Sequence, residues 1–219
     1  MCNFVAENCN LLSMAKQLEY AFRLVHIKNI SHILDVGFVL PTSPKASNNY
    51  IPIGDSVVIA KRNTLRNSGH IDLGQYIPFY FGPRSPMLYV IQNGFNGVTQ
   101  YYPSALVYCI VRLSDILEQD VDCMFTDGHA FSAITKYYSK EELRRIDEII
   151  KQEDVYAKFW NVEDDLDLKR RKEAELLIKK ELPAKYIRGF VVYNNEARDI
   201  LLGYGIDASK IAVRESFYF

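Results

Sequence analysis

The amino-acid sequence predicts a mixed α+β fold for a chain of 219 residues. Apolar, β-branched runs typical of strands and capped amphipathic runs typical of helices both occur along it. They do not alternate as a doubly wound parallel sheet would require, and this irregular order favours α+β. No internal repeat and no Pro/Gly/Ser-rich linker divides the chain, so we expect one domain over residues 1–219.

The first elements are predicted to be a helix, a strand and a second helix. Residues 11–21 have apolar side chains at helical spacing, and residues 22–26 are predicted to form a strand. A helix over residues 30–36 begins after Asn29, a favourable N-cap residue. It ends before Gly37, because glycine suits the backbone conformation that follows a helix.

A long polar segment follows at residues 41–55 and is rich in Pro, Ser, Asn and Gly. Structureless loops of this length inside a compact domain are usually either functional or disordered. Asp55 or Ser56 can then cap a short helix that leads to Lys61 and Arg62.

The middle of the chain contains two predicted strands around a helix. Residues 76–81 form an aromatic strand, and Ser85 and Pro86 begin a helix that ends at Gly94. Residues 105–113, which are apolar without a break from 105 to 111, are predicted to form a central strand.

The C-terminal half continues the mixed pattern. Residues 121–125 are predicted to form a strand, and Ser139 with Glu142 forms a capping box for a charged helix that extends to about residue 152. The remaining predicted elements are strands at residues 174–178, 186–193 and 210–219 and a helix at residues 196–202.

The charge balance excludes a protein that coats duplex DNA. The chain has 26 basic and 27 acidic residues and a formal net charge of -1, whereas such proteins are strongly basic. A small basic cleft for a short strand is still allowed. The chain is rich in aromatic residues, with 15 Tyr and 12 Phe. This suits nucleotide ligands but also a β-rich core, and we favour the core for any single tyrosine.

The cysteines and the hydropathy pattern indicate a cytoplasmic protein. The four cysteines are irregularly spaced and include no Cys-x-x-Cys pair, which excludes a disulfide framework and a zinc ribbon. We find no signal-peptide segment and no apolar run near the roughly 20 residues of a membrane-spanning helix. The four histidines show no metal-ligand spacing, so we expect no metal.

Four segments are informative together, whereas the common nucleotide-binding and hydrolase motifs are absent. They are LVHIKNI at residues 24–30, YIPFYFGPRSPMLY at 76–89, FTDGHA at 125–130 and KEAELLI at 172–178. In this order and spacing they resemble the DarT family, toxins that transfer ADP-ribose from NAD to bases in single-stranded DNA. The resemblance extends from about residue 22 to residue 193.

The resemblance implies an ADP-ribosyltransferase-like fold with two small facing β-sheets, flanking helices and NAD in the cleft between the sheets. NAD would be the ADP-ribose donor and would be consumed. The family's catalytic glutamate corresponds to Glu175 and its catalytic arginine to Arg62. Cleavage of the nicotinamide–ribose bond develops positive charge on the sugar, and a carboxylate near the ribose stabilises that charge.

The resemblance also implies residues that bind the two substrates. His26, Ile27 and Lys28 match the segment that grips NAD, and Asp35, Ser43 and Arg62 are further candidates for NAD contacts. Residues 43–62 would close over NAD. The candidates for contacts with DNA are His129, Tyr138, Arg170 and Arg171.

One departure leaves the acceptor open. Family members often have Gln two positions before the catalytic glutamate, where this chain has Glu173. A Glu-x-Glu pair is typical of related enzymes that modify protein arginine, because a second carboxylate can act as a general base. The expected acceptor is thymine, with guanine and protein arginine as alternatives, and a nucleotide-binding module without turnover as a less favoured reading.

A base-modifying enzyme of this kind would be the toxin of a toxin–antitoxin system. The resemblance implies a macrodomain or another ADP-ribosyl hydrolase as the antitoxin partner. No heptad pattern or long apolar stripe indicates self-association, so we expect a monomer.

Overall fold

The computed structural model describes residues 18–64 and 71–219, with the side chains of residues 63 and 64 left out of the description. The strands in this part of the chain are β1 (Tyr20–His26), β2 (Phe38–Val39), β3 (Tyr76–Tyr80), β4 (Leu106–Arg112), β5 (Cys123–Thr126), β6 (Tyr137–Ser139), β7 (Glu175–Lys179), β8 (Glu181–Leu182), β9 (Ile187–Val192) and β10 (Ile211–Val213).

The helices are mostly short. The α-helices are α2 (Ile30–Val36), α3 (Ser56–Thr64), α4 (Pro86–Asn93), α5 (Leu113–Glu118), α6 (Ile146–Ile149), α7 (Gln152–Val155), α8 (Leu168–Lys172) and α9 (Asn195–Gly203). Single 3-10 segments lie at Ile27–Asn29, Leu73–Gln75, Phe95–Gly97, Pro103–Ala105, Lys140–Arg145, Ala184–Tyr186, Ala208–Lys210 and Glu215–Phe217.

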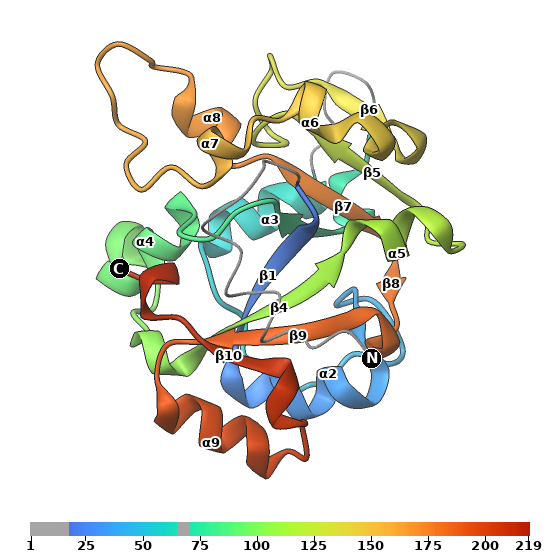
Figure 1. Cartoon of the computed structure of the whole chain (residues 1–219), viewed down its shortest axis with the longest axis vertical. Helices are drawn as coiled ribbons and strands as arrows, with labels where there is room; N and C mark the ends of the chain where they lie inside the picture. Colours follow the sequence, from blue (N-terminus) through green and yellow to red (C-terminus); the bar gives the residue numbers. More distant parts are fainter. Residues whose placement is uncertain (1–17, 65–70) are drawn as a thin grey trace.

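An eight-stranded sheet with the order β10-β9-β4-β1-β3-β7-β5-β6 forms the centre of the molecule (Figure 1). Its two halves, β10-β9-β4-β1 and β3-β7-β5-β6, are joined by the pairing of β1 with β3, which has the single register pair Phe22 and Tyr80. The α+β prediction is confirmed, with the strands arranged in one large sheet and one two-stranded sheet. A separate ladder joins β2 to β8.

The sheet is covered on both faces, which explains the unbroken apolar run of β4. Val107, Cys109 and Val111 contribute to one buried cluster of side chains, and Leu106 and Tyr108 contribute to another. Because successive side chains of a strand point to opposite faces, both faces of β4 must be apolar. The prediction of a central strand here is confirmed, with β4 lying between β9 and β1.

Three predicted elements differ from the structure. Tyr20 and Ala21 begin β1 instead of ending a helix, because β1 pairs with β4 along all seven of its residues; residues 11–17 of that predicted helix lie outside the described part. The strand predicted at residues 210–219 ends at Val213. The charged helix predicted to continue to residue 152 is instead a 3-10 segment followed by α6, although its capping box at Ser139 is present.

The end of the chain is irregular because side chains from other elements hold it. The Arg84 guanidinium donates to the Tyr218 carbonyl over 2.8 Å and lies over the Phe219 ring, 4.2 Å from its centroid. Gln92 exchanges two hydrogen bonds with the backbone of Phe219. These contacts satisfy backbone groups that a strand ladder would otherwise satisfy.

Five of the helices lie at opposite ends of the molecule in Figure 1. In that view α2 and α9 lie at one end, with β9, whereas α6, α7 and α8 lie at the other end, with β5 and β6. In residues 18–64 and 71–219, no helix is long and apolar enough to cross a membrane.

Candidate active site

The candidate site is built around Glu175, the first residue of β7, whose side chain is fully buried. Its Oε2 accepts a hydrogen bond from the Arg62 guanidinium over 2.8 Å, and its Oε1 accepts from the Ala130 backbone N–H over 3.0 Å. A buried charge is stable only when it is paired and hydrogen-bonded, and Glu175 meets both conditions. The structure therefore joins the two residues that were expected to be catalytic.

Two elements far apart in the sequence bring this pair together. Glu175 lies opposite Tyr80 in the β3–β7 ladder, and Arg62 lies in the last turn of α3. Helix α3 begins where predicted, because Oδ1 of Asp55 accepts from the backbone N–H groups of Val57 and Val58. This cap starts the helix that carries Arg62.

The ion pair keeps Glu175 charged. Burial by itself raises the pKa of this carboxyl, but the Arg62 guanidinium holds it below the ordinary value. Burial has the opposite effect on Arg62, and the Glu175 carboxylate more than offsets it, so the pKa of Arg62 is raised. The site thus presents a carboxylate and a protonated guanidinium in a place with little solvent.

The carboxylate still has acceptor capacity for a ligand. Each carboxylate oxygen can accept about two hydrogen bonds, and each oxygen of Glu175 accepts one from the described residues. A negative charge in this position can stabilise a positive charge that develops on a sugar ring as its leaving group departs. This is the chemistry that the pair can perform.

Residues 127–136, here called the 127–136 loop, supply the Ala130 N–H. The N–H of Asp127 donates to the carbonyl of Lys136 over 3.3 Å, and the N–H of Lys136 donates to Oδ1 of Asp127 over 2.9 Å. At its base, the Thr126 hydroxyl accepts from the Glu175 N–H over 3.1 Å and donates to the Gly128 carbonyl over 2.7 Å. The loop is therefore tied directly to the strand that carries the carboxylate.

The expected NAD-binding segment lies at the end of β1. His26 is buried, its Nδ1 accepts from the Lys28 N–H over 3.2 Å, and its ring packs edge-on against Tyr101. Burial, with a smaller effect of Lys28, lowers the pKa of His26. Ile27 is buried and Lys28 is exposed. None of these three residues has a described contact with Glu175.

Asn29 connects this segment to the long loop at residues 41–55. Its side chain donates to the carbonyl of Ile51 over 2.7 Å and accepts from the N–H of Ile51 over 2.9 Å. The prediction that Asn29 caps α2 is therefore corrected: its side chain makes no capping bond, because Ile51 takes both of its polar atoms. Asp35 is exposed on α2, and the half-buried Ser43 accepts from the N–H of Lys45 within the loop.

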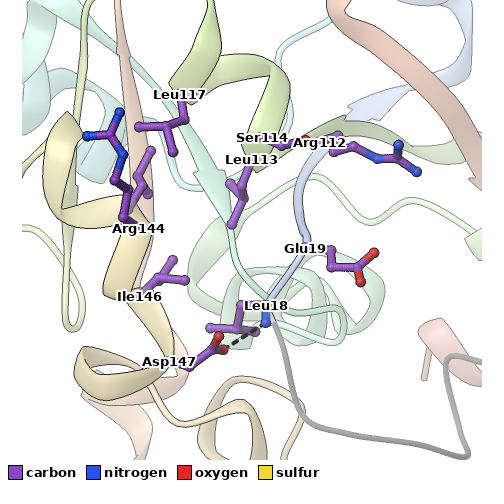
Figure 2. Close-up of a pocket in the computed structure, with 10 residues that line it drawn as sticks. Leu18, Glu19, Arg112, Leu113, Ser114, Leu117, Arg144, Ile146 and Asp147 are labelled. Atoms are coloured by element: carbon purple, nitrogen blue, oxygen red, sulfur yellow. Dashed lines mark hydrogen bonds between the residues drawn. The ribbon is translucent and has the colours of Figure 1, made fainter.

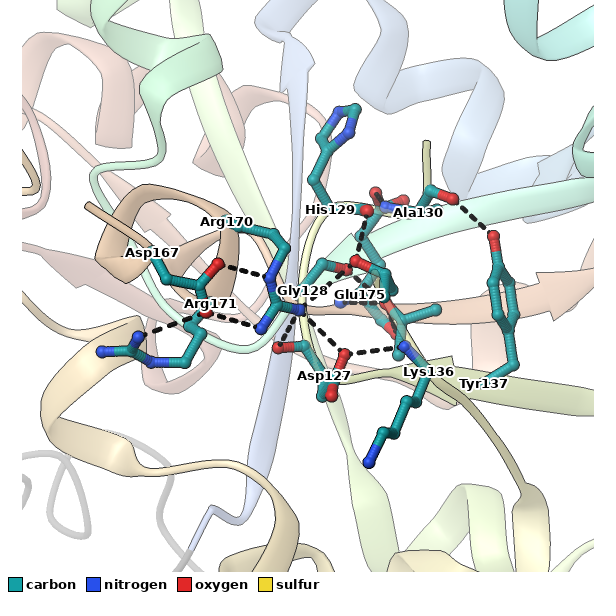
Figure 3. Close-up of polar contacts among 12 residues, drawn as sticks. Asp127, Gly128, His129, Ala130, Lys136, Tyr137, Asp167, Arg170, Arg171 and Glu175 are labelled. Carbon is teal, nitrogen blue, oxygen red and sulfur yellow. Dashed lines mark hydrogen bonds and ion pairs between the residues drawn. The ribbon is translucent and has the colours of Figure 1, made fainter. Parts of the chain in front are cut away.

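The expected DNA-binding residues lie around the 127–136 loop. His129 is half-buried and points away from the ion-pair network that Figure 3 shows beneath it. Burial lowers the pKa of His129, although Glu175 opposes this. Tyr138 stacks on Phe125, with ring centroids 5.1 Å apart.

Arg170 and Arg171 point toward carboxylates of the protein. Arg170 pairs with Asp127 and Asp167, and Arg171 pairs with Asp154, Asp165 and Asp167. Their contact with DNA stays a prediction. Next to them, the amine of Lys172 is buried and donates to the carbonyls of Pro83 and Val155.

Sequence reasoning missed three residues that shape the site: Tyr80, Asp127 and Ala130. All three lie within the segments at residues 76–89 and 125–130, but no local pattern marks them. The Tyr80 phenol is buried beside Glu175, and both burial and that carboxylate raise its pKa. Ala130 acts through its backbone N–H, which any residue other than proline would offer.

A pocket of about 400 Å³ lies elsewhere, between the start of β1, the junction of β4 with α5, and α6 (Figure 2). Leu18, Arg112 and Asp147 are among the residues that line it, and the N–H of Leu18 donates to Asp147 across its floor. Neither Arg62 nor Glu175 lines this pocket. The buried ion pair and this pocket are therefore separate features of the molecule.

Comparison with known proteins finds related sequences and folds. The family model described as "ssDNA thymidine ADP-ribosyltransferase, DarT" matches residues 22–219. A DNA ADP-ribosyl transferase of Escherichia coli O127:H6 is 34% identical over 194 residues, which cover 85% of each chain. A fusion protein of Thermosipho africanus, a DNA ADP-ribosyl transferase joined to a DNA ADP-ribosyl glycohydrolase, is 30% identical over 177 residues, or 80% of this chain and 42% of the fusion.

Solved structures show the same fold. Thermus sp. 2.9 DarT in complex with ADP-ribosylated single-stranded DNA matches with a TM-score of 0.74 and 24% identity, over 94% of this chain and 100% of that one. The same protein in complex with NAD⁺ matches with a TM-score of 0.71 and 23% identity over the same shares.

Proposed function

This chain belongs to the DarT family, and we propose that it transfers ADP-ribose from NAD to thymine in single-stranded DNA. The observation that carries the proposal is the buried ion pair of Glu175 with Arg62, 2.8 Å apart. NAD is a substrate in this reaction and is consumed.

The pair suits the bond changes. The bond from the ribose to nicotinamide breaks, and nicotinamide leaves with the electron pair. Glu175 stabilises the positive charge that develops on the ribose. In a thymidine nucleotide N1 carries the deoxyribose, so N3 is the remaining ring nitrogen that can form the new bond, and its proton is released.

Arg62 does not act as a general base in this reaction. Its guanidinium is protonated and its pKa is raised further by Glu175, so it does not accept the thymine proton. It holds Glu175 in place and can stabilise negative charge on the phosphates or on the thymine.

The remaining candidates are assigned around this pair. His26, Ile27, Lys28, Asp35 and Ser43 are proposed to contact NAD, because Asn29 links their segment to the loop that leads to α3 and Arg62. His129 and Tyr138, on and beside the 127–136 loop, are proposed to face the DNA.

A toxin role and a hydrolase partner are part of the proposal. The transferase of Thermosipho africanus is fused to a DNA ADP-ribosyl glycohydrolase, and such an enzyme would reverse the modification. We place the reaction in the cytoplasm as one domain, 1–219, acting as a monomer. The buried cysteines Cys109 and Cys123 are free, which suits a reducing compartment.

The direct test is incubation with NAD and four single-stranded oligonucleotides, each with a different base in a fixed context, read by mass spectrometry. We expect an ADP-ribose mass increment on the oligonucleotide with thymine. An increment on the guanine oligonucleotide would move the acceptor to guanine. Label on protein only would support the arginine-modifying alternative that Glu173 suggests.

A matched variant tests the site in the same assay. Glu175→Gln keeps the shape of the side chain and an oxygen for the Ala130 N–H but removes the charge. We expect NAD affinity within several-fold of the wild type and transfer reduced by at least about 100-fold. Full transfer by this variant would show that the active-site assignment is wrong.

A further inference from the structure

We propose that Arg170 is a positioning residue for the reaction: it holds the 127–136 loop so that the loop's Ala130 N–H reaches Glu175. This inference rests on the proposed function for its catalytic consequence. Arg170 itself touches neither Glu175 nor any group that was assigned to the reacting atoms.

The side chain of Arg170 is a clamp with three partners (Figure 3). Nε and one terminal nitrogen donate to the two oxygens of Asp167 over 2.7 and 2.8 Å. The other terminal nitrogen donates to Oδ1 of Asp127 over 2.9 Å and lies within 3.3 Å of the Thr135 hydroxyl. Asp127 and Thr135 stand near opposite ends of the loop, so one guanidinium joins both ends.

The backbone adds a second connection. The carbonyl of Arg170 accepts from the N–H of His129 over 2.9 Å. Gly128 packs so closely that a Cβ there would lie 2.3 Å from a guanidinium nitrogen of Arg170. The loop segment 128–130 is therefore pressed against Arg170 on one side, and on the other it offers the Ala130 N–H to Glu175.

The charges around Arg170 favour a structural role over binding of a DNA phosphate. Its side chain is 15% exposed and its one positive charge faces the carboxylates of Asp127 and Asp167, the second of which also pairs with Arg171. A cation that binds a DNA phosphate must be exposed, because it raises the affinity for DNA by displacing counterions from the strand. Arg170 offers little of its charge to solvent.

The test compares Arg170→Gln with the wild type in steady-state transfer to a thymine oligonucleotide. We expect kcat at saturating DNA to fall about 10- to 100-fold, as for a displacement of about 1 Å at the reacting groups. The KM for DNA and the salt dependence of DNA binding should stay unchanged. Arg170→Lys should recover part of kcat, because an amine can pair with one carboxylate but cannot replace the planar fork.

Asp127→Asn distinguishes the two roles of Arg170, because they predict opposite changes in kcat/KM for DNA. Asn keeps an oxygen for the Lys136 N–H but removes the charge that Arg170 grips. If Arg170 positions the loop, kcat falls. If Arg170 binds a phosphate, the variant frees its charge, so KM for DNA falls and kcat stays.

Arg188→Gln is the matched control, because Arg188 also pairs with an aspartate, Asp115, but lies on β9 in the other half of the sheet. We expect wild-type kcat from it. Unchanged kcat in Arg170→Gln, with a raised KM for DNA and a salt slope smaller by about 0.7, would overturn the proposal in favour of a phosphate contact.

One measurement does not depend on activity toward DNA. Amide hydrogen exchange of a peptide spanning residues 127–136 should be faster in Arg170→Gln than in the wild type, in the absence of any substrate. Equal exchange would overturn the clamp. Absence of DNA transfer by the wild type would instead contradict the proposed function and leave this comparison valid.

Discussion

Glu175 has no exposed side-chain surface, and its chemistry depends on what surrounds it. Arg62 and the Ala130 N–H each occupy one of its oxygens. Because burial favours the neutral acid, the charged form persists only while these partners remain. The contacts of Glu175 with Arg62 and with the Ala130 N–H therefore determine the pH range in which the site can work.

Arg62→Gln is expected to move that range. It removes the main group that counters burial, so the pKa of Glu175 rises and the acidic limb of the kcat–pH profile moves to higher pH. Single-turnover transfer between pH 5 and pH 8 measures the shift. Lys61→Gln, on the exposed part of the same helix, is the control and should leave the profile in place. An unmoved acidic limb in Arg62→Gln would contradict the assignment.

Glu173 makes a separate prediction about stability. Burial is the largest cause that raises its pKa, to about 7, above the ordinary 4.5. The folded state thus binds more protons than the unfolded state between about pH 4.5 and 7, so Glu173 lowers stability as pH rises through that window. Glu173→Gln stays neutral and should be about 1–2 kcal/mol more stable at pH 8, after allowance for solvent at a half-buried group.

Thermal unfolding between pH 4 and pH 8 checks this prediction, with the exposed Glu163→Gln as the control. The melting temperatures of the wild type and Glu173→Gln should agree near pH 4 and separate as pH rises. A constant difference at all pH values would show that Glu173 does not titrate in this window. Retained transfer to DNA by Glu173→Gln would further show that the second carboxylate is not the base.

At the scale of elements, one side chain links the 41–55 loop to the end of β1. Asn29 makes both of its hydrogen bonds to Ile51, and this attaches the loop to the end of β1 beside His26. The loop leads directly into α3 and so to Arg62. The placement of Arg62 therefore depends on a loop whose position is determined in part by Asn29, a residue outside the loop.

Asn29→Ala should loosen this loop. It leaves the backbone N–H and carbonyl of Ile51 without these partners, at a cost of about 1–3 kcal/mol in the free energy of unfolding. We expect KM for NAD to rise several-fold, because the loop and Arg62 are less well placed for NAD. Asn93→Ala, at an exposed asparagine that bonds to its own helix, should change neither quantity. A wild-type KM for NAD in Asn29→Ala would show that the position of this loop does not affect NAD binding.

At the scale of the whole molecule, charge limits how DNA is bound. With 26 basic and 27 acidic residues, the chain has a formal net charge of -1 and no general attraction for a polyanion. The described cations near the 127–136 loop are partly committed to aspartates. Recognition must therefore rest on a few local contacts around one base.

This predicts a shallow salt dependence of oligonucleotide binding. Each phosphate contact on a single strand contributes about -0.7 to the slope of log K against log salt concentration. We expect a slope between about -1 and -3, measured by fluorescence anisotropy of the wild-type protein from 50 to 300 mM salt. A slope steeper than about -5 would indicate a long electrostatic groove instead.

The sequence alone was enough for the elements whose signals are local. The cap at Ser85 with Pro86 predicts α4, the cap at Asp55 predicts α3, and the apolar run around residues 106–111 predicts a strand covered on both faces. The catalytic assignment of Glu175 came from one of the four segments that resemble a known family, whereas Arg62 lies outside these segments and was assigned from the family resemblance alone. These signals act over a few residues, so they survive without knowledge of the fold.

Only the tertiary structure decided which polar groups meet. Arg62 and Glu175 are 113 positions apart, and Arg170 reaches Asp127 across 43 positions. A basic run at residues 169–172 looks like a solvated or phosphate-binding surface in sequence, yet Arg170 and Lys172 turn inward. Burial makes an unpaired polar group costly, so its partner is chosen by whatever the fold places within hydrogen-bond distance, and no local pattern contains that information.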